Sequence, residues 1–423
     1  MPEHSKPIQS MDIKQVIAWS LYDFANSAYS AVIYTFVFSA YFINEIAPSE
    51  IQGTQLWGYT ISASSLFVAF LGPIIGTIAD FGGKHKSWLF LFTSIGVIST
   101  VFLWFVHPNI HSIQLALTCM FISTVAFELA KVFYNSLLPN IVSSDYLGRV
   151  SGWGWSCGYL GGLLCLILSL IVLEQREFFL IAGIKNKEDI HIIILLVAIW
   201  VSVFSLPIFL FVKQKKSENF KVISAVKKGL KELKITLKNF PQQRDLLLFL
   251  IARLFYMDGV NSLMALGGVF AAGTFHFSVY DMIIFGIILN ITAGIGAALF
   301  AWIDDWIGSK KTVLIALGCF TAMFCYLLTI KSRNLFWMAA PFIGVFVGPI
   351  QAASRTFLAR LAKPEEITRM YGFYSFSEKS TSFLGPFLVG SLTAWAGSQR
   401  IGMLALLPFF IVGGGLLLRV SQK

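Results

Sequence analysis

Apolar residues fill long runs along almost the whole chain, and short polar segments separate each run from the next. Each run is long enough to cross about 30 Å of hydrocarbon as an α-helix. The pattern therefore predicts an all-α membrane protein with twelve transmembrane helices. We expect these helices at residues 16–43, 56–79, 88–107, 112–138, 149–173, 191–212, 246–272, 280–303, 312–330, 335–359, 370–396 and 401–419.

The composition agrees with this prediction. Charged residues make up 13% of the 423 residues, whereas a soluble domain usually has about 25%. The first run follows a polar lead that contains Lys6 and Lys14, and it is too long for a cleavable signal peptide. The five cysteines lie inside apolar runs and lack metal-type spacing. The sequence shows no phosphate-binding loop and no nucleophile triad, so we expect no enzyme activity, cofactor or metal.

The distribution of lysine and arginine predicts how the chain crosses the membrane. If both termini are cytoplasmic, the cytoplasmic segments hold 22 of these residues and the opposite side holds six. Such an excess of positive charge is typical of the cytoplasmic side. The net charge of +10 is dispersed among loops, so it gives no reason to expect a nucleic-acid partner.

The sequence repeats itself on either side of a long polar loop, 213–245. The matching segments are "DFANS" (23–27) with "DGVNS" (258–262), "GTIADFGGKHK" (76–86) with "AWIDDWIGSKK" (301–311), and "SDYLGRVSGW" (144–153) with "PEEITRMYGF" (364–373). All three matches keep the same order relative to the predicted helices. We therefore expect two pseudo-symmetric six-helix bundles, residues 1–212 and 246–423. This is the plan of the major facilitator transporters.

Several motifs resemble those of known transporter families. The loop after the second run resembles the major facilitator signature at Gly76, Asp80, Gly83, Lys84 and Lys86, although a histidine interrupts its basic end. The motifs "WxxYDxANS" in the first run, "VFYNSLLP" (132–139), "ARLFYMDGVNS" (252–262) and "SFLGP" (382–386) resemble the autophagy-related vacuolar effluxers and their bacterial relatives.

This resemblance implies a secondary transporter that works by alternating access, which we expect to be a monomer. The fungal members are associated with amino-acid efflux. The compact chain has no large insertion, which favours a bacterial member in the plasma membrane. Glu378 stands where the family tends to have a small residue, so the family's substrate does not transfer directly to this chain.

Ionisable residues within the predicted helices mark the candidate site. They are Asp23, Glu128, Lys131, Arg253, Asp258, Arg355, Glu378 and Lys379. Each would cost roughly 2.5–3.5 kcal/mol or more if it faced lipid, so we expect them to face the interior between the two halves. Their polar neighbours Asn26, Tyr134, Asn135, Tyr256 and Asn261 complete the set of residues predicted to bind substrate or couple protons.

Some of these residues also have simpler interpretations. Glu128 and Lys131 have an ion-pair spacing on one helix, so either they neutralise each other or one of them contacts substrate or a proton. Asp23 and Asp258 occupy equivalent positions in the repeat. They handle substrate or protons, or else they hold helices together through hydrogen bonds.

The charges also bear on substrate and coupling. At least one of Arg253 and Arg355 is expected to bind an anionic group of the substrate, since guanidinium pairs well with carboxylate or phosphate. The alternative is an ion pair with a carboxylate of the protein itself. A carboxylate in a poorly hydrated cavity can take up a proton near neutral pH, and Asp23, Glu128 and Asp258 are the candidates.

The repeated loop motifs predict a cytoplasmic gate. By the repeat symmetry, Asp80 should face Arg369 and Asp305 should face Arg149 across the boundary between the halves. We expect both pairs to form when the cytoplasmic side closes and to break when it opens. The alternative is that these charges only set the membrane topology.

The loop 213–245 predicts a helix on the membrane surface. Six apolar residues recur every three or four positions from Ile223 to Phe240, among five lysines. Such a stripe on a basic helix is typical of contact with anionic lipid headgroups. A coiled-coil partner is the alternative.

These observations favour a proton-coupled transporter that exports a small metabolite, such as an amino acid or a related compound. An exporter of amphipathic lipid or drug-like molecules is the first rival, and the 15% of aromatic residues suits it. A non-transporting membrane receptor or scaffold with the same fold is the third hypothesis.

Overall fold

A computed structural model describes residues 12–48, 50–82, 84–174, 189–213, 231, 234–235, 238, 243–275, 277 and 279–421. The regular elements of these residues are helices. Before the central loop they are α1 (Ile13–Ala28), η1 (Tyr29–Phe36), α2 (Val37–Tyr41), η2 (Phe42–Ile46), α3 (Glu50–Gly82), α4 (His85–Phe102), η3 (Leu103–Phe105), η4 (Ile110–Ser112), α5 (Ile113–Ile141), η5 (Ser144–Tyr146), α6 (Leu147–Glu174) and α8 (Asp189–Phe211). After the loop they are α10 (Arg244–Phe275), α11 (Val279–Ile307), α12 (Ser309–Thr329), α13 (Arg333–Ala339), α14 (Pro341–Leu361), η7 (Pro364–Glu366), α15 (Ile367–Lys379), α16 (Leu384–Ala396), α17 (Gln399–Met403), η8 (Leu404–Leu406) and α18 (Leu407–Leu418).

Helices occupy all twelve predicted runs, but the first and the eleventh run do not form long continuous helices. Ten helices in the described part of the chain are long and apolar enough to cross a membrane. The first run instead contains two π-helical segments, Tyr29–Phe36 and Phe42–Ile46. The eleventh run breaks at residues 380–383, between α15 and α16. Both interruptions fall in runs that contain candidate site residues, and π-helical turns are frequent at functional sites.

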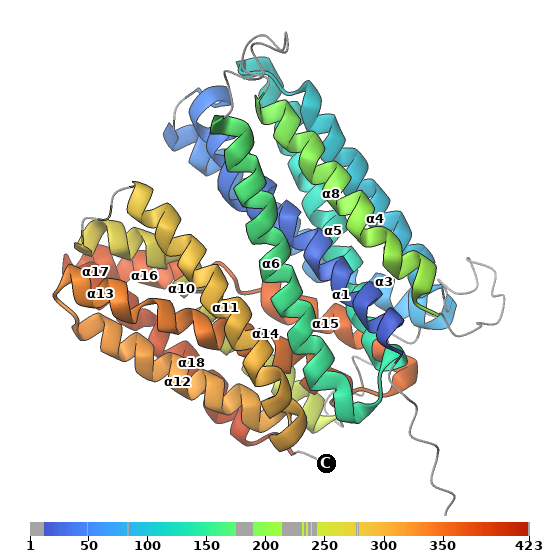
Figure 1. The fold of residues 1–423 in the computed structure, drawn as a ribbon. Coiled ribbons are helices and arrows are strands. Elements are labelled where there is room, and N and C mark those ends of the chain that lie inside the picture. Colours follow the sequence, from blue (N-terminus) through green and yellow to red (C-terminus); the bar gives the residue numbers. More distant parts are fainter. Residues whose placement is uncertain are drawn as a thin grey trace, which may run out of the picture.

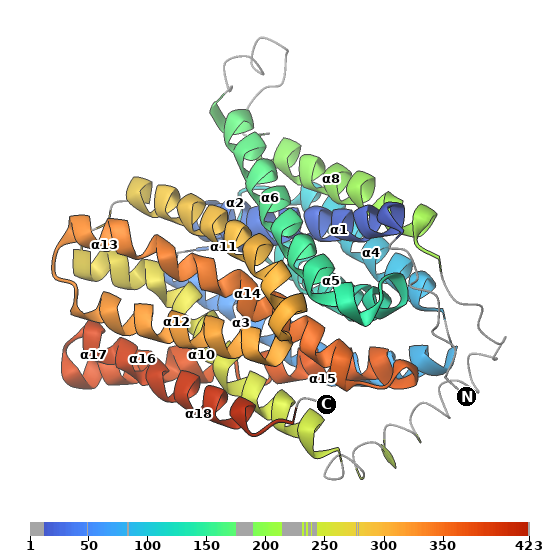
Figure 2. The same cartoon turned by 60° about the horizontal axis from the view of Figure 1, so that its bottom comes forward.

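The helices form two bundles that lie side by side, α1–α8 and α10–α18 (Figures 1 and 2). The most extensive contacts between the bundles are those of α3 with α15 and of α6 with α11, and α14 with α6 and α15 with α5 add smaller ones. In the internal repeat α3 corresponds to α11 and α6 to α15, so pseudo-symmetry relates the two contacts. The predicted fold of two six-helix bundles is confirmed. In Figure 1 the bundles are closest near the first turns of α6 and α15 and splay apart toward the other end.

Glycines allow the backbones to touch at both contacts. A Cβ atom on Gly372 of α15 would lie 2.5 Å from the carbonyl oxygen of Gly72 in α3. A Cβ atom on Gly152 of α6 would lie 2.6 Å from the carbonyl oxygen of Ala297 in α11. No larger residue fits either place without moving a helix, so these glycines set how closely the halves approach.

The outer surface carries large apolar side chains, as expected of helices in contact with lipid. Trp306 near the end of α11 is 86% exposed and Trp395 in α16 is 83% exposed. Tryptophan is enriched at membrane interfaces, which agrees with these positions near helix ends. Gly83 and most of the loop 213–245 lie outside the described residues, so the predicted surface helix stays a prediction.

Candidate functional site: a charged cavity between the two halves

A cavity of about 320 Å³ lies between the two bundles. Its walls come from α1, η1, α5 and α6 on one side and from α10, α11, α14 and α15 on the other. Nine of the predicted site residues line it: Asp23, Asn26, Glu128, Lys131, Tyr134, Asn135, Arg253, Arg355 and Glu378. The sequence pattern therefore brings charges from five separate runs to one place.

Arg355 of α14 connects the two halves inside this cavity. Its Nη1 lies 3.1 Å from Oδ2 of Asp23 on α1. Its Nε donates to the Ser151 hydroxyl at 2.9 Å, and its Nη2 donates to the Ser151 carbonyl at 2.6 Å. The guanidinium also lies over the Trp19 ring, 4.8 Å from its centroid. The arginine side chain is 3% exposed, so its charge is compensated almost entirely by these groups of the other half.

Aromatic packing holds the Asp23 side of the cavity in place. The Trp19 ring stacks on Tyr134 with 4.4 Å between centroids, and its Nε1 donates to the Tyr134 carbonyl at 3.0 Å. The Tyr134 hydroxyl and the Asn26 Oδ1 are buried, and no hydrogen bond of either atom is found among the residues that the structure describes. Since unpaired buried polar groups are costly, these two atoms are available to a polar ligand in the cavity.

Arg253 of α10 anchors a second cluster within the C-terminal half. It forms an ion pair with Glu378 of α15. Its Nη1 donates to the Tyr374 carbonyl at 2.8 Å and to the Ser377 hydroxyl at 3.0 Å. The guanidinium carbon lies 3.3 Å from the centroid of the Tyr374 ring.

A third cluster crosses between the halves. Glu128 of α5 lies 3.0 Å from Nζ of Lys131 on its own helix and 3.6 Å from Nζ of Lys379 on α15. Glu378 and Lys379 are adjacent, yet one pairs within its own half and the other across the boundary. The ion pairs that we gave as alternatives for Glu128 with Lys131 and for Arg355 are therefore present in this structure.

Four predicted residues do not line the cavity: Tyr256, Asp258, Asn261 and Lys379. Tyr256 is buried and shares a 2.7 Å hydrogen bond with the Ser354 hydroxyl. Asp258 is 1% exposed and faces α16 near Gly385. The expectation that Asp258 borders the cavity opposite Asp23 is therefore wrong for this structure, because the repeat preserves the position along the helix but not the neighbours.

The gate residues meet across the boundary, and at the first gate the contacts differ from those expected. Asp80 accepts hydrogen bonds from the backbone amides of Thr368 and Arg369, at 3.1 and 2.8 Å. These amides belong to the first turn of α15, where the helix dipole favours a carboxylate. The Arg369 guanidinium instead pairs with Glu366 at 2.6 Å. The expected side-chain pair of Asp80 with Arg369 is thus replaced by a bond to the backbone.

The second gate combines the same kind of backbone contact with the expected side-chain pair of Asp305 and Arg149. Asp305 accepts hydrogen bonds from the amides of Gly148 and Arg149 at the start of α6, at 2.8 and 3.0 Å. The Arg149 Nε lies 3.6 Å from the same carboxylate. Asp80 and Asp305, which the repeat relates, therefore each cap the N-terminus of a helix in the opposite half, α15 and α6.

The other predicted gate residues have local roles. A Cβ atom on Gly76 would lie 2.6 Å from the Thr368 carbonyl oxygen, so this glycine permits the α3–α15 contact. Lys86 donates to the carbonyls of Phe209 and Val212 at the end of α8, at 2.8 and 2.6 Å. Lys84 is exposed, and Gly83 lies outside the described residues.

Sequence reasoning missed Arg360. Its Nη1 lies 3.0 Å from Asp304, its Nη2 lies 3.3 Å from Asp305, and the same Nη2 donates to the Ser144 carbonyl at 3.2 Å. It therefore joins the second gate to the other half. Its place at the cytoplasmic end of the tenth run is the feature that could have predicted this role, because that end of the run lies beside the gate residues. The polar residues Ser151 and Gln351 were also missed, although both belong to runs that line the cavity.

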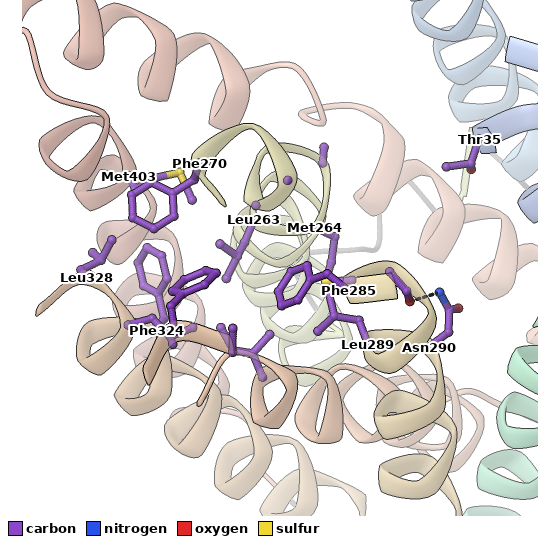
Figure 3. Close-up of a pocket in the computed structure, with 18 of the residues that line it drawn as sticks. Thr35, Leu263, Met264, Phe270, Phe285, Leu289, Asn290, Phe324, Leu328 and Met403 are labelled. Atoms are coloured by element: carbon purple, nitrogen blue, oxygen red, sulfur yellow. Dashed lines mark hydrogen bonds between the residues drawn. The ribbon is translucent and has the colours of Figure 1, made fainter. Parts of the chain in front are cut away.

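A second cavity of about 320 Å³ adjoins the charged one and is mostly apolar (Figure 3). Its apolar walls include Leu263, Met264, Phe270, Phe285, Leu289, Phe324, Leu328 and Met403. Thr35, Phe36 and Asn290 line both cavities, so the two spaces are neighbours. Figure 3 shows Thr35 and Asn290 at one end and Phe324 and Met403 toward the other.

Solved transporter structures share this fold. The proton:xylose symporter XylE bound to 6-bromo-6-deoxy-D-glucose superposes with a TM-score of 0.75 at 13% identity, over 97% of this chain and 95% of XylE. The major facilitator transporter FucP in its outward conformation superposes with a TM-score of 0.75 at 14% identity, over 98% of this chain and all of FucP. At these identities the likeness shows the fold alone.

Relatives found by sequence similarity identify the family of this chain more narrowly than the fold does. The uncharacterized MFS-type transporter YxiO of Bacillus subtilis is 29% identical over 418 residues, covering 97% of this chain and 95% of the relative. Autophagy-related protein 22 of Saccharomyces cerevisiae is 24% identical over 390 residues, covering 79% of this chain and 72% of the relative. The family described as vacuole effluxer Atg22 like matches residues 43–423. The chain therefore belongs to this Atg22-like family of major facilitator transporters, and it is a multi-pass membrane transporter and not an enzyme.

Proposed function

We propose that the protein is a secondary exporter of small zwitterionic metabolites, amino acids or related compounds, and that it uses the proton gradient. One observation carries this proposal. The charged cavity is lined by acid–base pairs, Asp23 with Arg355 and Arg253 with Glu378, and it lies between two halves that are held together at one end.

A zwitterion matches these pairs chemically. Its carboxylate can take the place of Asp23 or Glu378 on a guanidinium, and its ammonium group can take the place of a guanidinium on a carboxylate. Each exchange replaces one ion pair with another, so no charge is left unpaired in the cavity. Binding at Asp23 and Arg355 would also replace a bond between the halves with bonds to the ligand, which links substrate binding to the movement of the halves.

The gates supply the other part of alternating access. In this structure both carboxylate caps are formed, and the halves are joined at that end of the molecule. The lysine and arginine pattern assigns this end to the cytoplasm. The protein then works as a monomer in a bacterial plasma membrane with cytoplasmic termini, and the basic loop 213–245 lies on anionic headgroups.

Transport in proteoliposomes tests the proposal. We expect purified protein to move at least one radiolabelled amino acid, faster with a pH gradient than without one. The same substrate should compete with unlabelled amino acids and not with neutral sugars. If no amino acid moves under either condition, the exporter assignment is wrong, and a receptor or scaffold becomes the better account.

The apolar cavity favours a second candidate, an exporter of amphipathic lipid or drug-like molecules, and one variant separates the two. Gly286 lines this cavity, and a Cβ atom there would meet nothing within 4 Å. We expect Gly286→Phe to fill the space without unfolding the protein. Transport of a bulky apolar amino acid should then fall about tenfold, while transport of alanine should stay near the wild-type rate.

Gly390→Phe is the matched control for this variant. Gly390 also has open space around it but lies outside both cavities, so its replacement should change neither rate. If Gly286→Phe has no effect on any amino acid and abolishes transport of an amphipathic dye, the lipid or drug-like candidate replaces the amino acid.

A further inference from the structure

Asp258 differs from every other ionisable residue in the middle of the membrane. It is 1% exposed near the centre of α10. The other seven ionisable residues predicted within the helices all form ion pairs. None of the ion pairs found among the described residues includes Asp258. An unpaired carboxylate in such a place is very costly when charged, and the usual resolution is to bind a cation or a proton.

The charged groups on the helices packed against α10 are engaged elsewhere. On α10 itself, Arg253 bonds Glu378, Tyr374 and Ser377. On α15, Lys379 pairs with Glu128. On α14, Arg355 pairs with Asp23 and Arg360 with Asp304 and Asp305. On α17, Arg400 donates to the Leu328 carbonyl. Helices α16 and α18 carry no charged residue. The described structure thus provides Asp258 with hydroxyl groups and no positive charge.

Those hydroxyl groups surround the carboxylate at the break in the eleventh run. Ser262 donates to Oδ1 at 3.2 Å, and the described residues give Oδ2 no hydrogen bond of regular geometry. The Thr381 side chain lies beside the carboxyl group. The hydroxyls of Ser380 and Thr381 are buried, and within the described part of the chain neither makes a hydrogen bond of regular geometry. A Cβ atom on Gly385 would lie 3.1 Å from Oδ1, so the backbone of α16 closes over the acid.

We propose that Asp258, with Ser262 and Thr381, is the site that holds the coupling proton, outside the substrate cavity. This inference rests on the proposed function. In the structure the acid is 1% exposed and no cation pairs with it among the described residues, which fits a carboxylic acid that holds a proton and shares it with a neighbouring hydroxyl. Loss of the proton leaves a bare charge in a dry site, so release requires water to enter.

The break between α15 and α16 connects this acid to the substrate cavity. Glu378 and Lys379 end α15, and Thr381, two residues after Lys379, brings its side chain to Asp258. Both views show α16 as a separate segment after α15 (Figures 1 and 2). A ligand that displaces Glu378 from Arg253 would therefore also move the segment 380–383 beside Asp258. Substrate binding and proton release are coupled through two residues of chain.

Infrared difference spectroscopy of the full-length protein tests this site without any substrate. Spectra at acidic and alkaline pH should show a carbonyl band of a buried protonated carboxyl that is lost at alkaline pH. We expect Asp258→Asn to remove this band and Asp23→Asn, its partner in the repeat, to keep it. Asp258→Glu should restore a shifted band. This last variant keeps the test valid if Asp258→Asn folds poorly.

Two results would overturn the inference. One is a band that persists in Asp258→Asn. The other is a band that vanishes when sodium chloride replaces choline chloride at constant pH, because the site would then hold Na⁺ and not a proton. The proposed function fails separately, by the absence of amino-acid transport in the wild type while the Asp258 band is present. If the proposed function and the proton site at Asp258 are both correct, a pH gradient should no longer accelerate transport by the Asp258→Asn variant.

Discussion

Replacing Arg355 with leucine should abolish transport and lower the free energy of unfolding by about 3–5 kcal/mol. The loss is large because Asp23 would keep its charge in a mostly buried place with no partner, and Ser151 would lose both of its contacts with the guanidinium. Thermal unfolding followed by tryptophan fluorescence and proteoliposome transport measure the two effects.

A double variant separates stability from function at this site. Asp23→Asn combined with Arg355→Leu removes both charges, so most of the stability should return while transport stays absent. Arg355→Lys is the second control, since it keeps the charge but lacks the planar fork that lets Arg355 reach Asp23 and both acceptors of Ser151. If Arg355→Leu transports like the wild type, this ion pair has no part in the substrate site.

The predictable parts of this protein are those that depend on the order of residues along a helix. Apolar runs and the positions of charges within them suffice to place Asp23, Glu128, Arg253 and Arg355 around one cavity, because burying a charge in lipid is too costly for another arrangement. The repeat likewise places Asp80 beside the start of α15. These inferences need only spacing and symmetry.

The parts that could not be predicted depend on which face of a helix meets which neighbour. Asp23 and Asp258 occupy equivalent positions, yet one pairs with an arginine and the other faces α16. The π-helical turns at Tyr29–Phe36 change the direction of side chains that follow Asp23, and no periodicity marks them. The apolar cavity could not be predicted from the sequence for another reason. Its space lies beside Gly267 and Gly286, which have no side chain to fill it.

The gate contacts change the expected behaviour of a charge swap. A pair of side chains would tolerate exchange of the acid and the base, whereas a carboxylate that caps a helix would not. Asp80 bonds two backbone amides of α15, so its partner remains in every variant of Arg369. Asp305 also bonds two backbone amides, but it pairs with the Arg149 and Arg360 side chains as well, so side-chain charge contributes at the second gate.

Asp80→Ala should shift the protein strongly toward the state that is open at the cytoplasmic end. Each charge-assisted hydrogen bond contributes about 1.5–3 kcal/mol, so even the lower end of this range for two lost bonds, about 3 kcal/mol, changes the balance between the states more than about a hundredfold. Thr356 is buried in the contact between the halves and donates to the Leu147 carbonyl of the other half. In a background without the native cysteines, a thiol reagent should label Thr356→Cys about a hundred times faster once Asp80→Ala is added.

Variants of Arg369 complete this test, because they distinguish a backbone cap from a side-chain ion pair. Arg369→Ala keeps the amide that Asp80 uses, so it should change labelling by only a few-fold, through loss of its bond to Glu366. The exchanged pair, Asp80→Arg with Arg369→Asp, should stay as open as Asp80→Ala. Recovery of the closed state in the exchanged pair would mean that charge alone holds the gate. The closed state would then depend on side chains that this structure keeps apart, and the same variants at Asp305 and Arg149 would show whether the two gates differ.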